Sequence, residues 1–154
     1  MKLWHVGFAF GLVLLIPVVV MVTWPHPCRE CVAEIWDETL SEAGSHRFNY
    51  CGYFHLAKAG DAGALQNLFE FAKSTDAGSA LGHGAALMKI LQAIGDERFA
   101  NCIRRQPQDL KRLIGNFIEV GMDYGLDKDP EEAAILFPLS TEAAFEGSKE
   151  RLFR

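Results

Sequence analysis

The feature that most constrains this 154-residue chain is an uncharged run of 19 residues, from Val6 to Trp24. As an α-helix such a run extends about 28 Å at ~1.5 Å per residue, close to the ~30 Å hydrocarbon core of a bilayer. Trp4 and Trp24 stand at its ends, where indole rings favour the lipid–water boundary. Pro17 would break a helix in water but is tolerated in a membrane span. Residues 6–24 are therefore predicted to form a transmembrane helix.

Whether this segment is kept or removed depends on the residues that follow it. A signal peptidase needs small residues just before the cut, and the sequence VMVTWPHP offers no such site. The apolar stretch is also longer than the ~7–15 residues of an ordinary signal peptide. We expect a retained anchor over residues 1–27, with a cleaved signal peptide or a lipoprotein acylated on Cys28 as alternatives. The basic Lys2 before the span favours an extracytoplasmic, periplasmic location for residues 28–154.

Gly7 and Gly11 are four residues apart and would share one face of the span. Small residues at this spacing let two membrane helices approach closely, which suggests a homodimer formed through this face. The alternative is incidental use of glycine, which is common in membrane helices.

The rest of the chain has helical spacing of apolar residues and no sustained alternation, which predicts an all-α domain. The apolar stripes predict helices around residues 31–43, 48–60, 65–72, 87–94, 99–103 and 110–118. Asp129–Glu132 is typical of another helix start, and Pro138 is expected to end that segment. Ser140 or Thr141 is then expected to cap a last short helix.

Two similar turns punctuate the domain, at Gly60-Asp61 and Gly95-Asp96, 35 residues apart. In each, the glycine suits a left-handed helix end, and the aspartate can accept the first free amides of the next helix. A comparable turn follows at residues 126–129. These junctions resemble those of TPR-, Sel1- and HEAT-type arrays, although no diagnostic repeat signature is present. The domain is therefore expected to be either an α-solenoid-like stack of helix pairs or an irregular bundle.

Four cysteines allow several disulfide pairings. Cys51 and Cys102 both fall on apolar helix faces, so our first expectation is a bridge between them, with Cys28 bound to Cys31 or free. If Cys51 and Cys102 lie too far apart, Cys31 becomes the expected partner of Cys51, because the first two helices are expected to be antiparallel. The alternative for Cys51 and Cys102 is two reduced core thiols.

Cys28 and Cys31 also allow two chemical interpretations. A Cys-x-x-Cys pair at a helix start can hold a low-pKa thiol, as in thiol oxidoreductases, but the strands that normally flank such motifs are missing from the pattern. With Cys51 and His55 the pair gives a spacing that suits a structural zinc ion. An oxidising compartment opposes this zinc site, because it consumes the thiols.

Other signs of catalysis are weak. His83 lies between Gly82 and Gly84, so it either faces a ligand or belongs to a tight helix contact. The sequence has no nucleophile elbow, Walker loop, His-Glu-x-x-His motif or dinucleotide fingerprint. A binding protein is therefore favoured over an enzyme, and a small hydrolase whose site the sequence does not reveal is a weaker alternative.

The charge distribution points away from nucleic acid and toward a protein. The chain has 15 basic and 20 acidic residues, which disfavours binding to nucleic acid. One basic cluster stands out around the turn at Gln106-Pro107. It consists of Arg104, Arg105, Lys111 and Arg112. We interpret it either as a solvated helix face or as a docking patch for an acidic partner or anionic lipid headgroups.

These observations predict a membrane-anchored, extracytoplasmic helical module that binds another protein. An inhibitor or immunity protein against a periplasmic toxin, or a scaffold for an envelope complex, would fit. The alternative is a structural zinc or thiol-redox domain built on Cys28 and Cys31.

Overall fold

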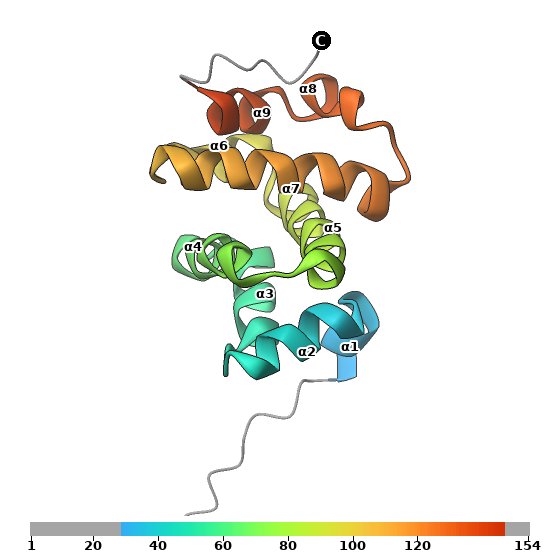
Figure 1. The fold of residues 1–154 in the computed structure, drawn as a ribbon. Helices are drawn as coiled ribbons and strands as arrows, with labels where there is room; N and C mark the ends of the chain where they lie inside the picture. Colours follow the sequence, from blue (N-terminus) through green and yellow to red (C-terminus); the bar gives the residue numbers. More distant parts are fainter. Residues whose placement is uncertain (1–28, 147–154) are drawn as a thin grey trace, which may run out of the picture.

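The computed structural model describes residues 29–146, and within this range all regular structure is helical, as predicted (Figure 1). The α-helices are α1 (Arg29–Glu34), α2 (Asp37–Ser45), α3 (Tyr50–Lys58), α4 (Ala62–Phe71), α5 (Ala77–Ile94), α6 (Asp96–Arg104), α7 (Gln108–Leu126), α8 (Ala133–Leu136) and α9 (Pro138–Phe145). Two short 3-10 helices are η1 (Ala72–Ser74) and η2 (Pro130–Glu132).

The predicted membrane anchor lies outside these residues. Within 29–146, every helix is too short or too polar to cross a bilayer. The run 6–24, the glycine pair Gly7 and Gly11, and Cys28 are not among the described residues.

The helices form a stack in which α1 and α2 lie at one end and α8 and α9 at the other (Figure 1). Helix α5 lies in the middle and packs against α2, α3 and α7, with α7 as its largest contact. Helix α4 pairs with α3, and α9 covers α6 and α7. The helix pairs α3–α4, α5–α6 and α7–α9 therefore follow one another along the stack, and each pair contacts the next.

The core is built from the apolar stripes that the sequence predicts. On α4 with the adjoining η1, and on α6 and α7, the predicted inner residues are buried at Leu65, Leu68, Phe69, Ala72, Phe99, Ile103, Leu110, Ile114, Phe117 and Ile118. Phe69 and Phe99 meet edge to face, with ring centroids 5.3 Å apart, and so join α4 to α6.

Two glycines allow α5 and α7 to pack closely. A Cβ atom added at Gly121 would lie 2.5 Å from the carbonyl oxygen of Gly84, and one added at Gly84 would lie 2.7 Å from the side chain of Val120. Backbone therefore meets backbone at this crossing, a separation that no residue with a side chain permits.

Several helix boundaries differ from the prediction, and α5 begins at Ala77, well before the expected range 87–94. The helix expected over 31–43 is broken at Trp36, whose extended backbone ends α1 and starts α2. On either side of this break Cys31 and Ile35 are buried, whereas Val32 and Trp36 are exposed. Pro138 begins α9 instead of ending α8, since proline is accepted at the first position of a helix.

The predicted turn at Gly60-Asp61 is confirmed. Gly60 has φ +94°, and the Asp61 carboxylate accepts the amide of Ala64 at 2.7 Å, which caps α4. The turn at residues 126–129 is also present, with Asp127 in the left-handed conformation.

The turn at Gly95-Asp96 is only half as predicted. Gly95 has φ +85°, but Asp96 is the first residue of α6 and does not cap it. Its two carboxylate oxygens instead accept the amides of Leu139 and Ser140, each at 2.8 Å. Asp96 therefore caps the distant helix α9.

Candidate functional site

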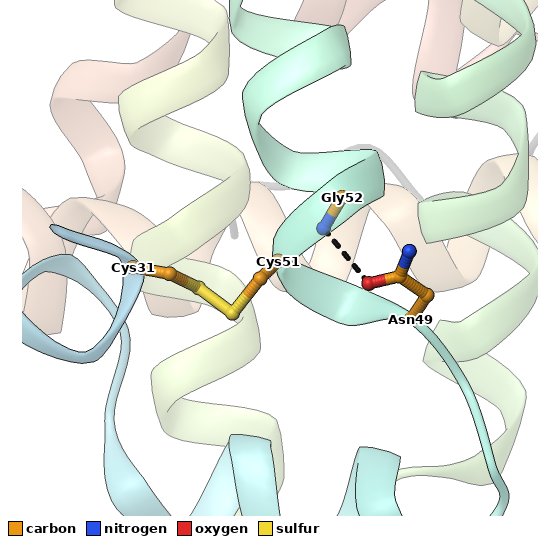
Figure 2. The surroundings of a disulfide bond; sticks show 4 residues. All are labelled: Cys31, Asn49, Cys51 and Gly52. Carbon is orange, nitrogen blue, oxygen red and sulfur yellow. Dashed lines mark hydrogen bonds between the residues drawn. A yellow bond between two sulfur atoms is a disulfide. The ribbon is translucent and has the colours of Figure 1, made fainter. Parts of the chain in front are cut away.

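The expected bridge between Cys51 and Cys102 is wrong. Cys31 and Cys51 form a disulfide with their Cα atoms 5.6 Å apart, and Cys102 is free (Figure 2). This is the alternative pairing derived from the first helices. Figure 2 shows Cys51 in the first turn of α3, where Asn49 accepts the amide of Gly52 at 3.1 Å and caps the helix.

The disulfide also removes the basis of both chemical alternatives. A zinc site of Cys28, Cys31, Cys51 and His55 would lose two of its thiolates to the bond. A redox pair of Cys28 and Cys31 is excluded in this state, because Cys31 is already bonded elsewhere. Among residues 29–146, no three His, Cys, Asp or Glu side chains are grouped in a way that would hold a metal.

His83 belongs to a tight helix contact. Its ring is fully buried on α5, with Nδ1 2.6 Å from the Tyr50 hydroxyl and the ring edge-on to Phe71 and Phe117. Burial lowers the pKa of His83 to about 3 and raises the pKa of Tyr50, so both groups are neutral at pH 7. A ring without exposed surface offers nothing to a ligand, which makes His83 a structural residue.

The predicted basic cluster comes together only in part. Arg104, Arg105 and Arg112 are exposed at the end of α6 and the start of α7. Lys111 is buried, and its ammonium lies 3.4 Å from the Glu146 carboxylate at the end of α9. The expectation that all four side chains form one docking patch is therefore wrong for Lys111.

Sequence analysis missed a fourth exposed arginine. Arg98 lies on α6 and precedes Arg105, the helical residue that follows α6, by seven positions, so the two share a face with Asn101 and Cys102 between them. This i, i+3, i+4, i+7 spacing is visible in the sequence and would have identified Arg98. We call Arg98, Arg104, Arg105 and Arg112 the basic surface.

One face of α6 borders a pocket of about 180 Å³, which opens beside the start of α4. Helix α6 contributes Arg98, Asn101 and Cys102, and Arg105 follows directly after the helix. The opposite side is formed by residues 60–62 with Leu65 and Ile94. Gly60 brings the turn close to Arg98, since a Cβ atom added there would lie 3.5 Å from its guanidinium.

The two arginines at this pocket outnumber the one carboxylate, that of Asp61, which also lines it. Within residues 29–146, neither Arg98 nor Arg105 forms an ion pair, whereas Arg104 donates to the Asn101 side chain at 2.8 Å. Burial raises the pKa of the Cys102 thiol, and the nearby Arg105 partly opposes this effect. The pocket therefore combines positive charge with a protonated, half-buried thiol.

The opposite charge gathers on α2. A hollow of about 380 Å³ beside this helix is lined by Asp37, Glu38, Glu42 and Asp76. Figure 1 places α2 at the same end of the stack as α1, whereas the turn between α6 and α7 lies toward the other end. The acidic side chains of α2 and the basic surface therefore lie on different parts of the described domain.

Comparison with protein-family profiles, with curated proteins and with solved structures finds no match for this chain. Function therefore has to follow from the geometry and charge of these surfaces.

Proposed function

We propose that the chain is a membrane-anchored, extracytoplasmic binding module whose basic surface holds an acidic region of a partner protein. The observation that carries this proposal is the concentration of positive charge at α6 and the start of α7. Residues 98–112 contain four exposed arginines and one acidic side chain, in a chain whose net charge is -5. Arginine is also the cation most enriched at protein interfaces.

The disulfide supports the proposed location. Structural disulfides persist in oxidising compartments such as the periplasm and are rare in the cytosol. The bond between Cys31 and Cys51 is therefore what we expect of a domain that the span at 6–24 holds outside the cytoplasm.

The position of the basic surface favours a protein over lipid headgroups. Helix α1 begins five residues after the uncharged run and lies with α2 at one end of the stack. A membrane anchored through that run would thus be nearest to α1 and α2. The turn between α6 and α7, with its arginines, would lie farther along the stack from it.

The helix contacts support an α-solenoid-like arrangement. Helices α3, α5 and α7 contact one another in order, and α4, α6 and α9 form a second row beside them. Stacked helix pairs of this kind present extended surfaces to protein partners without catalytic machinery. Inhibition of a periplasmic toxin and scaffolding of an envelope complex are both jobs that such a module can do.

The test is capture of a partner by the full-length protein extracted from membranes. Arg98, Arg104 and Arg105 are changed together to Ser, and Lys111 is left in place because it is buried. The matched control changes three other basic residues, Arg47, Lys73 and Lys128, which are also exposed. We expect the arginine variant to lose a partner that the control retains, and the wild-type complex to weaken as salt is raised.

Equal capture by both variants would contradict the role of the basic surface. The location is tested separately, by adding protease to spheroplasts. We expect the domain to be degraded while the cells remain intact, and a protected domain would overturn the extracytoplasmic assignment.

A further inference from the structure

The pocket between α4 and α6 is suited to one small anionic group. Its volume of about 180 Å³ is below the ~300–1,000 Å³ of sites for drug-sized ligands, so it accommodates a single side chain better than a cofactor. Leu65 is fully buried and provides an apolar wall with Ile94, while Arg98 and Arg105 provide the positive charge.

The charged groups around the pocket favour an anion from outside the domain. The Asp61 carboxylate is part of the lining, but it already accepts the amide of Ala64 and caps α4. Neither Arg98 nor Arg105 has an acidic partner in the part of the chain that the structure describes. The positive end of the α4 dipole opens at the same place and adds to the attraction.

We propose that this pocket is a carboxylate-accepting subsite, which takes a glutamate or aspartate side chain from an acidic segment of the partner. The two guanidinium groups would bind the carboxylate, and the apolar wall would contact its methylene stem. This inference rests on the proposed function and adds to it the chemistry of the residue that is recognised.

Cys102 allows the pocket to be tested without knowing the partner. In the full chain with Cys28→Ser, Cys102 is the free thiol, since Cys31 and Cys51 are bonded to each other. Its rate of reaction is measured with 5,5′-dithiobis(2-nitrobenzoate), which carries two carboxylates, and with neutral 4,4′-dithiodipyridine. In each case the thiolate attacks the disulfide of the reagent, forms a mixed disulfide and releases a coloured thiolate or thione.

The ratio of the two rates is the informative quantity. Removing Arg105 takes away the charge that opposes the raised pKa of Cys102, but this slows both reagents together and leaves the ratio unaffected. We expect the ratio of the anionic to the neutral rate to fall several-fold in Arg98→Gln and in Arg105→Gln. Arg104→Gln is the matched control, because Arg104 is adjacent in sequence but does not line the pocket. An unchanged ratio in both pocket variants would overturn the proposal.

A protection experiment separates a side-chain carboxylate from a simple anion. Poly-glutamate is expected to slow the reaction of Cys102 with the neutral reagent in the wild type and not in Arg98→Gln/Arg105→Gln. Inorganic phosphate at equal charge is expected to protect much less, because it has no apolar stem. Equal protection by phosphate would contradict a carboxylate subsite.

The two proposals can fail separately. If the arginine variant still loses its partner while poly-glutamate gives no protection, the basic surface binds a partner and the pocket is not its subsite. If poly-glutamate protects Cys102 but no partner is captured, the proposed function fails and the pocket remains an anion site.

Discussion

At the scale of single residues, the Tyr50–His83 pair is the clearest polar contact inside the core. The Tyr50 hydroxyl is hydrogen-bonded to Nδ1 of His83 at 2.6 Å, and both side chains are buried. The Nε2 atom of His83 has no hydrogen-bond partner among the described residues. A charged imidazole would be costly there, which is why burial lowers its pKa.

This pair predicts sensitivity to acid. The pKa of His83 is about 3 in the folded protein and about 6.5 in an unfolded chain, so the unfolded state takes up the proton first as the pH falls. Stability should therefore decline between pH 6.5 and 3, with a loss of about 2–3 kcal/mol at pH 4.5 from this group. Urea unfolding of the wild type at pH 7 and pH 4.5 measures the total loss.

A double substitution isolates this contribution from the carboxylates that titrate in the same range. Tyr50→Phe with His83→Leu removes both polar groups together, so neither is left buried without its partner. On acidification, the free energy of unfolding should decrease less in this variant than in the wild type. The two decreases should differ by about 2–3 kcal/mol. The same loss in both proteins would show that His83 titrates normally.

At the scale of helices, the crossing of α5 and α7 depends on the absence of side chains. Gly121→Ala would place a Cβ atom 2.5 Å from the Gly84 carbonyl oxygen, and backbone cannot move aside as a flexible side chain can. We expect a loss of about 1–3 kcal/mol, as for other overpacked cores. Gly44→Ala on α2 is the control, because no atom lies within 4 Å of its added methyl group. Its stability should be unchanged or rise by up to about 1 kcal/mol, and thermal denaturation compares the two.

A second prediction for the helices concerns the attachment of α9. Asp96 accepts both free amides at the start of α9, so Asp96→Ala should cost about 1–2 kcal/mol and make residues 138–145 easier to cleave. Glu97→Ala, which removes the neighbouring exposed acid, should have almost no effect. Limited proteolysis followed by mass spectrometry tests this, and equal cleavage of both variants would contradict the capping role.

These elements indicate where sequence reasoning succeeds. The cap at Asp61 is predictable because its acceptor and donor are three residues apart in the chain. Asp96 has the same local pattern, but its carboxylate is drawn to amides 43 and 44 residues away. No periodicity encodes that distance, since it depends on how α9 packs over α6.

For the basic surface too, the features that depend on neighbouring residues could be predicted, and those that depend on distant residues could not. The positions of Arg104 and Arg105 at a helix end could be predicted from the sequence. The seven-residue spacing between Arg98 and Arg105 could have placed Arg98 on the same face. The burial of Lys111 could not be predicted, because Glu146 approaches it from a helix 35 residues later. The choice of Cys31 over Cys102 as the partner of Cys51 likewise depends on the packing of three helices.

At the scale of the whole molecule, the disulfide should contribute substantially to stability. It closes a loop with a sequence separation of 20, for which loop entropy gives about 3 kcal/mol. The melting temperature of the wild type should therefore fall when a reductant is added. The variant Cys31→Ser/Cys51→Ser should have a melting temperature below that of the oxidised wild type, with or without reductant. In Cys102→Ser, the reductant should lower the melting temperature as much as in the wild type. A wild-type melting temperature that does not change with reductant would contradict the disulfide between Cys31 and Cys51.

The same bond sets how the folded chain would carry a mechanical load. A pull applied at the N-terminal side of α1 passes from Cys31 directly into α3 at Cys51, so α2 and the turn after it lie outside the load path. The bonds that hold α2 on α5, such as that from Thr39 to the Ser79 carbonyl, would then bear little of the force. In single-molecule stretching, the oxidised protein should unfold to a length about 65 Å shorter than the reduced one. A domain tied in this way resists tension first at its centre, where α3 meets α4 and α5.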